Sequence, residues 1–281
     1  SSGGFTLQRA TFSSARLAEL AKMDGGIVMD AGGAHILAAN VHFVPDSTIP
    51  TDETGSRHRT AERVAKQTQL PVVAVSEGRK VATLYTDGDK IELPSPAAIA
   101  ARVNQELQNL DRHRRQLTDA ETVLTNLEVS GMATSRAVVG LLQRTELVRR
   151  VGLSIERLAV TLGDEGRLAA VQVSDLLRGV EHTRDITVLD YSATKKAATK
   201  SIGNLEALPD PDLVDPVRVA KAVGITDLDQ AVEPRGVRVM SKAGRIPESV
   251  RETTVTHFGG FDKLIVASVE ELEAVEGVGL V

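Results

Sequence analysis

The feature that most constrains this fold is a change in the spacing of apolar residues near Pro96. Before it, apolar runs of a few residues alternate with turn signals, whereas after it apolar residues recur every three or four positions. Short runs bounded by turns predict strands, and the wider spacing predicts amphipathic helices. We therefore expect an N-terminal α/β domain over residues 1–97, with a mixed sheet flanked by helices, followed by all-helical domains.

Within the α/β part, four apolar runs are typical of strands: residues 26–29, 35–38, 72–75 and 81–85. Turn-forming residues separate the members of each pair, so two hairpins are expected. Apolar residues at helical spacing predict helices around residues 14–22 and 57–68.

The helical part is predicted to divide into residues 98–200 and 201–281. Its first helix is marked by spaced apolar residues: Val103, Leu107, Leu110, Leu117, Leu124 and Leu127. Arg114 and Glu121 interrupt this pattern, which favours a bundle or hairpin helix over a long coiled coil. A second helix is expected over about residues 136–162. Residues 192–200 are polar and basic, and we interpret them as a solvated linker, with a nucleic-acid tail as the lesser alternative.

Composition excludes several classes of protein. The chain has no Cys, so it has neither a disulfide framework nor a thiolate zinc site, and it is expected to be cytoplasmic. No run of apolar residues is long enough to span a membrane. The net charge of -5 gives no general attraction to nucleic acid, and 2% aromatic residues leave few platforms for unpaired bases. The glycine-rich motifs of P-loop and dinucleotide-binding proteins are absent.

The cluster Arg57-His58-Arg59 begins the second predicted helix. A helix N-terminus carries a partial positive charge, so two arginines there cost up to about 1 kcal/mol each at low salt. A bound anion resolves this cost, since backbone amides, two guanidinium groups and the Thr60 hydroxyl would converge on it. The alternative is pairing with nearby carboxylates: Asp52, Glu53 and Glu62. The residues alone favour neither reading.

Asp24-Gly25-Gly26 forms a second candidate site, where a predicted helix ends and a strand begins. Glycines allow a ligand close to the backbone, and the Asp24 carboxylate is suited to hold a metal ion or accept a hydroxyl proton. A plain helix C-cap with chain reversal is the commoner meaning of such a turn.

Together the two clusters resemble the diadenylate cyclase family, which carries a DGA motif and an RHRTA motif. The second motif is complete at residues 57–61, and residues 39–56 between the clusters also match. Further segments resemble the bacterial DNA integrity scanning family, which joins this cyclase to a DNA-binding domain: residues 143–148, 162–168, 233–236 and 277–279. The resemblance covers nearly the whole chain.

The resemblance implies that two ATP molecules are condensed into cyclic di-AMP, with release of pyrophosphate, at a site shared between apposed subunits. It places Asp24 at the reacting hydroxyl with a divalent cofactor, Mg²⁺ or Mn²⁺, and places the adenine against Phe43. It places Gly25 with Asp24 at the sugar and counts Gly26 among the ATP-binding residues. It assigns the phosphates to six residues: Arg57, His58, Arg59, Thr60, Ser76 and Arg79.

Two positions depart from the family pattern. Gly26 replaces the alanine of DGA, which we expect to loosen the turn without abolishing the site. Gly78 stands where related sequences often have a basic residue, so one phosphate contact is in doubt. We also expect the chain to lack the helix and strand that precede residues 3–5 in the family.

Gly277-Val278-Gly279 resembles the turn of a helix-hairpin-helix motif, whose first helix is predicted by a capping box at Ser268 and Glu271. The amides of Val278 and Gly279 would meet DNA phosphates without reading sequence, although a simple helix end explains the turn equally well. The resemblance adds a homo-oligomer, an octamer, located at the nucleoid and inhibited by branched DNA. The functional alternative is a non-catalytic DNA-binding scaffold that senses ATP or cyclic di-AMP.

Overall fold

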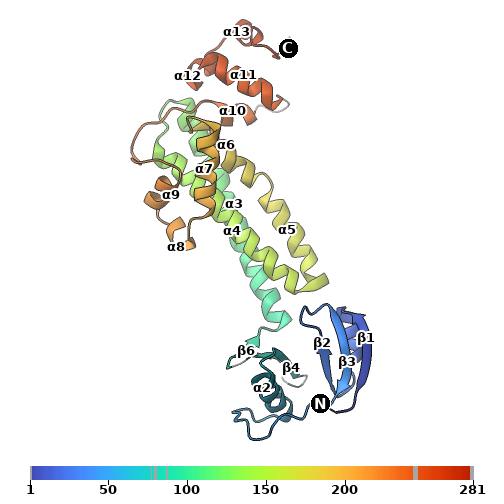
Figure 1. Cartoon of the computed structure of the whole chain (residues 1–281). Coiled ribbons are helices and arrows are strands. Elements are labelled where there is room, and N and C mark those ends of the chain that lie inside the picture. Colours follow the sequence, from blue (N-terminus) through green and yellow to red (C-terminus); the bar gives the residue numbers. More distant parts are fainter. Residues whose placement is uncertain (1, 77, 79–80, 87, 243–245, 279–281) are drawn as a thin grey trace. The chain divides into compact units, whose positions relative to one another are not determined.

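The computed structural model describes residues 2–76, 78, 81–86, 88–242 and 246–278 of the 281-residue chain. The chain divides into two compact units, Ser1–Ala98 and Ile99–Val281, whose elements are labelled in Figure 1. No helix in the described part of the chain is long and apolar enough to cross a membrane.

The first unit combines short strands with two helices. Its elements are β1 (Phe5–Thr11), α1 (Ser14–Leu20), β2 (Gly26–Met29), β3 (His35–Val41), α2 (Ser56–Thr68), β4 (Val72–Ser76), β5 (Val81–Tyr85) and β6 (Lys90–Leu93). The four predicted strands and both predicted helices are confirmed, while β1 and β6 are additional.

The strands form two three-stranded sheets, in the orders β1-β3-β2 and β4-β5-β6, and every described pairing is antiparallel. The prediction of a single mixed sheet is therefore wrong for the described residues. Short connections join β2 to β3, β4 to β5 and β5 to β6, and such connections permit only antiparallel neighbours. The helical crossover α2 leads from one sheet to the other, so it creates no parallel pair.

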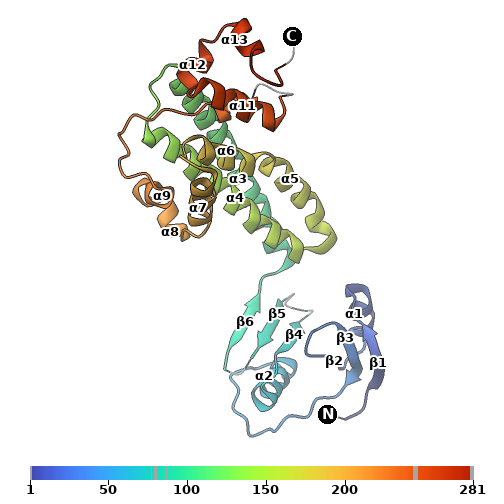
Figure 2. The ribbon, with the colours of Figure 1, turned by 45° about the horizontal axis from the view of Figure 1, so that its top comes forward.

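Helix α2 packs against β4 and β5, as Figure 2 shows. Its Ala61 and Ala65 are buried together with Ala74 and Tyr85 in a small core. Small side chains let the helix lie close to the sheet, and the contact fixes which face of α2 points outward.

The second unit is built from helices joined by loops. Its elements are α3 (Pro96–Val129), α4 (Ser135–Thr161), the 3₁₀ turn η1 (Gly163–Gly166), α5 (Arg167–Leu177), α6 (Val180–Asp190), α7 (Lys195–Glu206), α8 (Asp210–Leu213), α9 (Pro216–Ala222), α10 (Val237–Lys242), α11 (Glu248–Phe258), α12 (Phe261–Ile265) and α13 (Val269–Glu273). Both predicted long helices are confirmed as α3 and α4. On α3 the buried stripe recurs every seven residues, at Val103, Leu110, Leu117 and Leu124.

The predicted linker at residues 192–200 is wrong, because most of it belongs to helix α7. The Thr194 hydroxyl caps this helix by accepting the Ala197 amide at 3.1 Å. Ala198 and Leu205 are buried in the core of the unit. The boundary expected between residues 200 and 201 thus falls inside a packed helix.

A buried polar joint, which comprises Glu128, Asp190, Tyr191 and Arg238, ties α10 to α3 and to the end of α6. Arg238 donates from Nε to Glu128 Oε1 at 3.0 Å and from Nη2 to Glu128 Oε2, and the Tyr191 hydroxyl donates to Glu128 Oε1 at 2.7 Å. Asp190 accepts the backbone amides of Val237 at 2.8 Å and Arg238 at 3.2 Å. Burial raises the pKa of Asp190 to about 6, against the opposing effect of these amides.

Candidate nucleotide site

The two sequence clusters meet at one contact. The Arg57 guanidinium donates to Asp24 Oδ1 at 2.6 Å, across a separation of 33 residues. Asp24 lies in the turn between α1 and β2, and Arg57 lies in the first turn of α2. Both side chains are exposed, at 93% for Asp24 and 63% for Arg57. An ion pair so open to water adds at most about 1 kcal/mol to stability. Its importance is that it holds the Asp24 carboxylate beside the N-terminus of α2.

The N-terminus of α2 lacks the usual sources of negative charge. Its N-cap is Gly55, which provides no side-chain hydrogen bond, and its first turn contains no acidic residue. Arg59 folds back over the preceding loop and donates to the carbonyl oxygens of Glu53 at 3.3 Å and Thr54 at 3.1 Å. Thr60 is half-buried on the next position of the helix. The end of the helix therefore remains electropositive.

The alternative, in which the two arginines pair with Asp52, Glu53 or Glu62, is not found among the described residues. Glu53 instead pairs with Lys90 at 2.6 Å, and Glu62 pairs with Lys66 at 2.7 Å. The Lys90 ammonium is the main cause that lowers the pKa of Glu53, followed by the Tyr85 hydroxyl.

His58 points away from this exposed end, because it lies on the buried face of α2. It is only 5% exposed, and its Nδ1 lies 2.8 Å from the Tyr85 hydroxyl oxygen. That hydroxyl donates to Glu53 Oε1 at 2.7 Å. The expected phosphate contact of His58 is not supported by this burial. The ring is placed instead to hold α2 against β5, behind Arg57 and Arg59.

The turn at Asp24-Gly25-Gly26 is not the C-cap of the preceding helix, since α1 ends at Leu20 with Ala21 as its cap. A Cβ on Gly25 would lie 2.4 Å from the carbonyl carbon of Asn40 and 2.5 Å from its Cα, so only glycine fits there. Asn40 has a φ of 55° and lies beside the irregular β2–β3 pairing. Sequence reasoning missed Asn40. An asparagine within an apolar strand, where it is one of the few residues that tolerate the left-handed conformation, is the signal that would have found it.

The remaining predicted phosphate residues lie in or near the β4–β5 hairpin. Ser76 ends β4, is half-buried and pairs with Val81. A Cβ added to Gly78 would meet nothing within 4 Å, and Arg79 lies outside the described residues. No hydrogen bond joins Ser76 to the Asp24–Arg57 pair in the part of the chain that the structure describes.

The donor set for a metal ion is small. The described residues contain no group of three or more His, Asp or Glu side chains arranged to hold one. Asp24 presents an exposed carboxylate beside the N-terminus of α2. A single carboxylate is compatible with Mg²⁺ or Mn²⁺, because Mg²⁺ commonly takes only one or two protein carboxylates.

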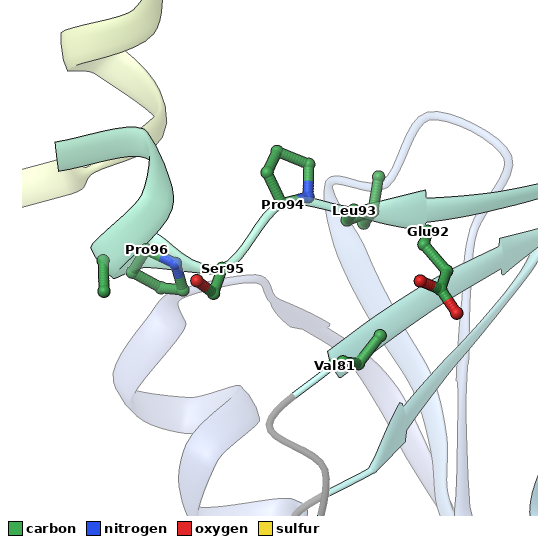
Figure 3. A pocket seen from close by; sticks show the side chains of 7 residues that line it. Val81, Glu92, Leu93, Pro94, Ser95 and Pro96 are labelled. Atoms are coloured by element: carbon green, nitrogen blue, oxygen red, sulfur yellow. The ribbon is translucent and has the colours of Figure 1, made fainter. Parts of the chain in front are cut away.

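A hollow of about 700 Å³ lies elsewhere, where β6 leads into α3. Figure 3 shows the residues that line it and labels six of them: Val81, Glu92, Leu93, Pro94, Ser95 and Pro96. None of the predicted nucleotide-binding residues that the structure describes belongs to its lining. The Asp24–Arg57 pair is therefore on an open surface rather than in this hollow.

The predicted capping box near the C-terminus is confirmed. The Ser268 hydroxyl accepts the Glu271 amide at 3.2 Å, and the Glu271 carboxylate accepts the Ser268 amide at 2.8 Å. Both bonds fix the start of α13.

The turn after α13 closes on itself. Gly277 has a φ of 91°, and the Val278 amide donates to the Val275 carbonyl at 3.1 Å. The Val278 amide, which the resemblance assigns to a DNA phosphate, already donates in this i to i+3 bond. Gly279 lies outside the described residues. The contacts fit the alternative reading of a simple helix end.

Comparisons with known proteins match both units. Residues 1–90 match the family described as "DisA bacterial checkpoint controller nucleotide-binding", and residues 93–232 match "DisA bacterial checkpoint controller linker region". The chain is 43% identical to the DNA integrity scanning protein DisA of Frankia alni, over 99% of this chain and 79% of that protein. It is 43% identical to DisA of Streptomyces avermitilis, over 99% of this chain and 76% of that protein. It is 41% identical to DisA of Kineococcus radiotolerans, over 99% of this chain and 79% of that protein.

Proposed function

Because this chain belongs to the DisA family of DNA integrity scanning proteins, we propose that it is a diadenylate cyclase. It would join two ATP molecules into cyclic di-AMP and release two molecules of pyrophosphate. The observation that carries this proposal is the contact between Asp24 and Arg57 at 2.6 Å. The contact sets a carboxylate beside a cluster of positive charge, in a domain that matches a nucleotide-binding family.

The electropositive end of α2 is suited to the triphosphate. Its free amides, the Arg57 guanidinium and the nearby Arg59 guanidinium face no acid of the first helical turn. Such an end binds phosphate through N–H donors and through the helix dipole. During the reaction negative charge builds on the leaving pyrophosphate, and the same groups would stabilise it.

Asp24 is the group that would act at the attacking hydroxyl. Each 3'-oxygen forms a bond to the α-phosphorus of the other nucleotide, the bond from that phosphorus to the β-phosphate oxygen breaks, and the hydroxyl proton is lost. Asp24 would orient this hydroxyl and draw its proton toward the carboxylate. A bound Mg²⁺ or Mn²⁺ would neutralise phosphate charge and make the hydroxyl more acidic.

Two such attacks close one ring, so the reaction has twofold symmetry, whereas one chain supplies a single Asp24 and a single Arg57. A second copy facing the first would complete the site. The open surface around the pair, with Asp24 93% exposed, is consistent with half a site. The proposal therefore includes a homo-oligomer, and the family resemblance favours an octamer.

DNA binding by residues 201–281 is proposed from the resemblance and from the relatives' name, DNA integrity scanning protein. A phosphate contact at the Val278 amide would require its bond to Val275 to open. A cyclase bound to DNA would be associated with the nucleoid.

The test uses the full chain with ATP and each metal in turn, at several protein concentrations, with products identified by mass spectrometry. We expect cyclic di-AMP at a rate that rises faster than linearly with protein concentration. Asp24→Asn should lose product by at least about 100-fold, an expectation based on the typical worth of a positioned acid or base. The matched control is Asp52→Asn, an exposed carboxylate of the same domain.

Two results would contradict the proposal. Full turnover by Asp24→Asn would remove Asp24 from the mechanism. ATP that binds to the wild-type chain but stays intact would favour the non-catalytic scaffold that senses ATP or cyclic di-AMP.

A further inference from the structure

The glycine that departs from the family motif has an unusual neighbour. Gly26 is the first residue of β2, which is an edge strand of the sheet β1-β3-β2. A Cβ on Gly26 would lie 1.9 Å from Phe43 Cε2, 2.7 Å from Cδ2 and 2.8 Å from Cζ. The ring of Phe43 therefore rests directly on the Gly26 backbone, in the space that any side chain would fill.

The register of the sheet explains this contact. Gly26 pairs with Val41 on β3, and Phe43 lies two residues farther along the chain. Positions two apart project to the same side of an extended chain, and such diagonal cross-strand neighbours lie within reach of an aromatic side chain. An aromatic ring placed over a glycine of an edge strand shields its backbone and pins the local register. Glycine at position 26 and phenylalanine at position 43 are thus complementary in size.

The ring is also close to the proposed chemistry. Gly26 is two residues from Asp24 and one from Gly25, whose backbone packs on Asn40. Phe43 is half-buried, so part of its ring stays accessible. Aromatic rings stack on nucleobases, with a substantial gain in affinity for each stacked base.

Building on the proposed function, in which the family resemblance places the adenine against Phe43, we infer that Gly26 is a positioning residue: its missing side chain seats the Phe43 ring against β2. The missing side chain at position 26 lets the ring lie against β2, beside the groups that would take the sugar and phosphates. An alanine there would push the ring off the strand, because its Cβ cannot approach ring carbons closer than about 3 Å. Glycine in place of the alanine of DGA is thus matched by the Phe43 ring that lies on it.

The experiment is a double-mutant cycle on the full chain with Gly26→Ala, Phe43→Leu and the combined variant. Three quantities are measured: the melting temperature without ligand, the Kd for ATP, and the separate KM and kcat for cyclic di-AMP formation. The matched control is Gly32→Ala, because a Cβ on Gly32 meets nothing within 4 Å.

We expect Gly26→Ala to lower the melting temperature by about 3 °C and to weaken ATP binding about 10-fold, mainly through KM. Phe43→Leu alone should weaken binding about 5-fold, in the range measured for loss of a stacked base. The combined variant should recover the melting temperature and bind ATP no worse than Phe43→Leu. Gly32→Ala should match the wild type in every readout.

Unchanged ATP affinity in Gly26→Ala would overturn the inference even if the protein still makes cyclic di-AMP. Failure of Phe43→Leu to restore the melting temperature of Gly26→Ala would also overturn it, since the clash would then involve backbone. If instead the double-mutant cycle gives the expected ATP affinities but neither the wild type nor any variant makes cyclic di-AMP, the inference about Gly26 and Phe43 is supported and the proposed cyclase activity is refuted.

Discussion

Replacing Asp190 with asparagine should remove a pH-dependent loss of stability from the second unit. Asp190 is fully buried at the end of α6, where its carboxylate accepts the amides of Val237 and Arg238 at the start of α10. Burial raises its pKa from 3.8 to about 6. The folded protein therefore holds a proton on this group more tightly than the unfolded chain does.

The raised pKa of Asp190 decides whether the free energy of unfolding rises or falls with pH. Below the unfolded pKa the carboxyl is protonated in both states and its contribution to stability is fully present. As pH rises through the folded pKa this contribution is lost, and it stays lost above about pH 6. The two pKa values differ by about two pH units, which corresponds to about 3 kcal/mol at about 1.4 kcal/mol per unit.

Asparagine keeps the shape but cannot ionise. Its side-chain oxygen can still accept the Val237 amide, whereas its NH₂ group faces the Arg238 amide, so one hydrogen bond of about 1 kcal/mol is lost. We therefore expect the free energy of unfolding of Asp190→Asn, relative to that of the wild type, to increase as pH rises. Near neutral pH the variant should be the more stable protein by about 2 kcal/mol.

Urea unfolding of both proteins, followed by circular dichroism between about pH 5 and about pH 7.5, measures this difference. About half of the 3 kcal/mol loss falls within that window. Other titrating groups are common to both proteins and cancel in the difference. A difference in unfolding free energy that stays constant with pH would refute the reasoning.

Two further predictions concern arginines. Arg57→Ala combined with Arg59→Ala should raise the Kd for ATP by about 10-fold to 100-fold. Each charge-assisted hydrogen bond contributes about 1.5–3 kcal/mol, and exposure to solvent weakens both bonds. Unchanged ATP affinity in a calorimetric titration would contradict the phosphate site. Arg238→Met should cost about 3–5 kcal/mol in unfolding free energy, since it strands the buried Glu128 carboxylate. Its control, Arg136→Met, breaks an exposed pair with Asp229 and should cost less than about 1 kcal/mol; equal losses would show that burial of the joint is not what matters.

Local pattern was enough to predict most elements of the first unit. The apolar runs and the helical spacing around residues 57–68 reflect which face is buried, and that information is local. The sheet arrangement was not predicted, because pairing between strands depends on contacts between residues that are far apart in the sequence. The helix at residues 195–206 was missed although Ala198, Ile202 and Leu205 lie at helical spacing. The lysines and threonines between them outweighed that signal.

The site was predicted unevenly for a similar reason. The resemblance placed Asp24 and Arg57 together, and the structure joins them across the chain. It also assigned His58 to the phosphates, but the burial of that ring depends on Tyr85, which belongs to a strand far along the sequence. Which of three consecutive residues faces inward was decided by the packing of α2 on its sheet.

The two glycines of the turn set different rules for how this sequence can evolve. A side chain at position 25 would strike the backbone of Asn40, and no substitution elsewhere makes room in a backbone. A side chain at position 26 would first strike the Phe43 ring, and a smaller residue at position 43 relieves that contact. Exchange of glycine for alanine at position 26 is therefore less costly after residue 43 has become smaller, so their contact favours one order of the two mutations.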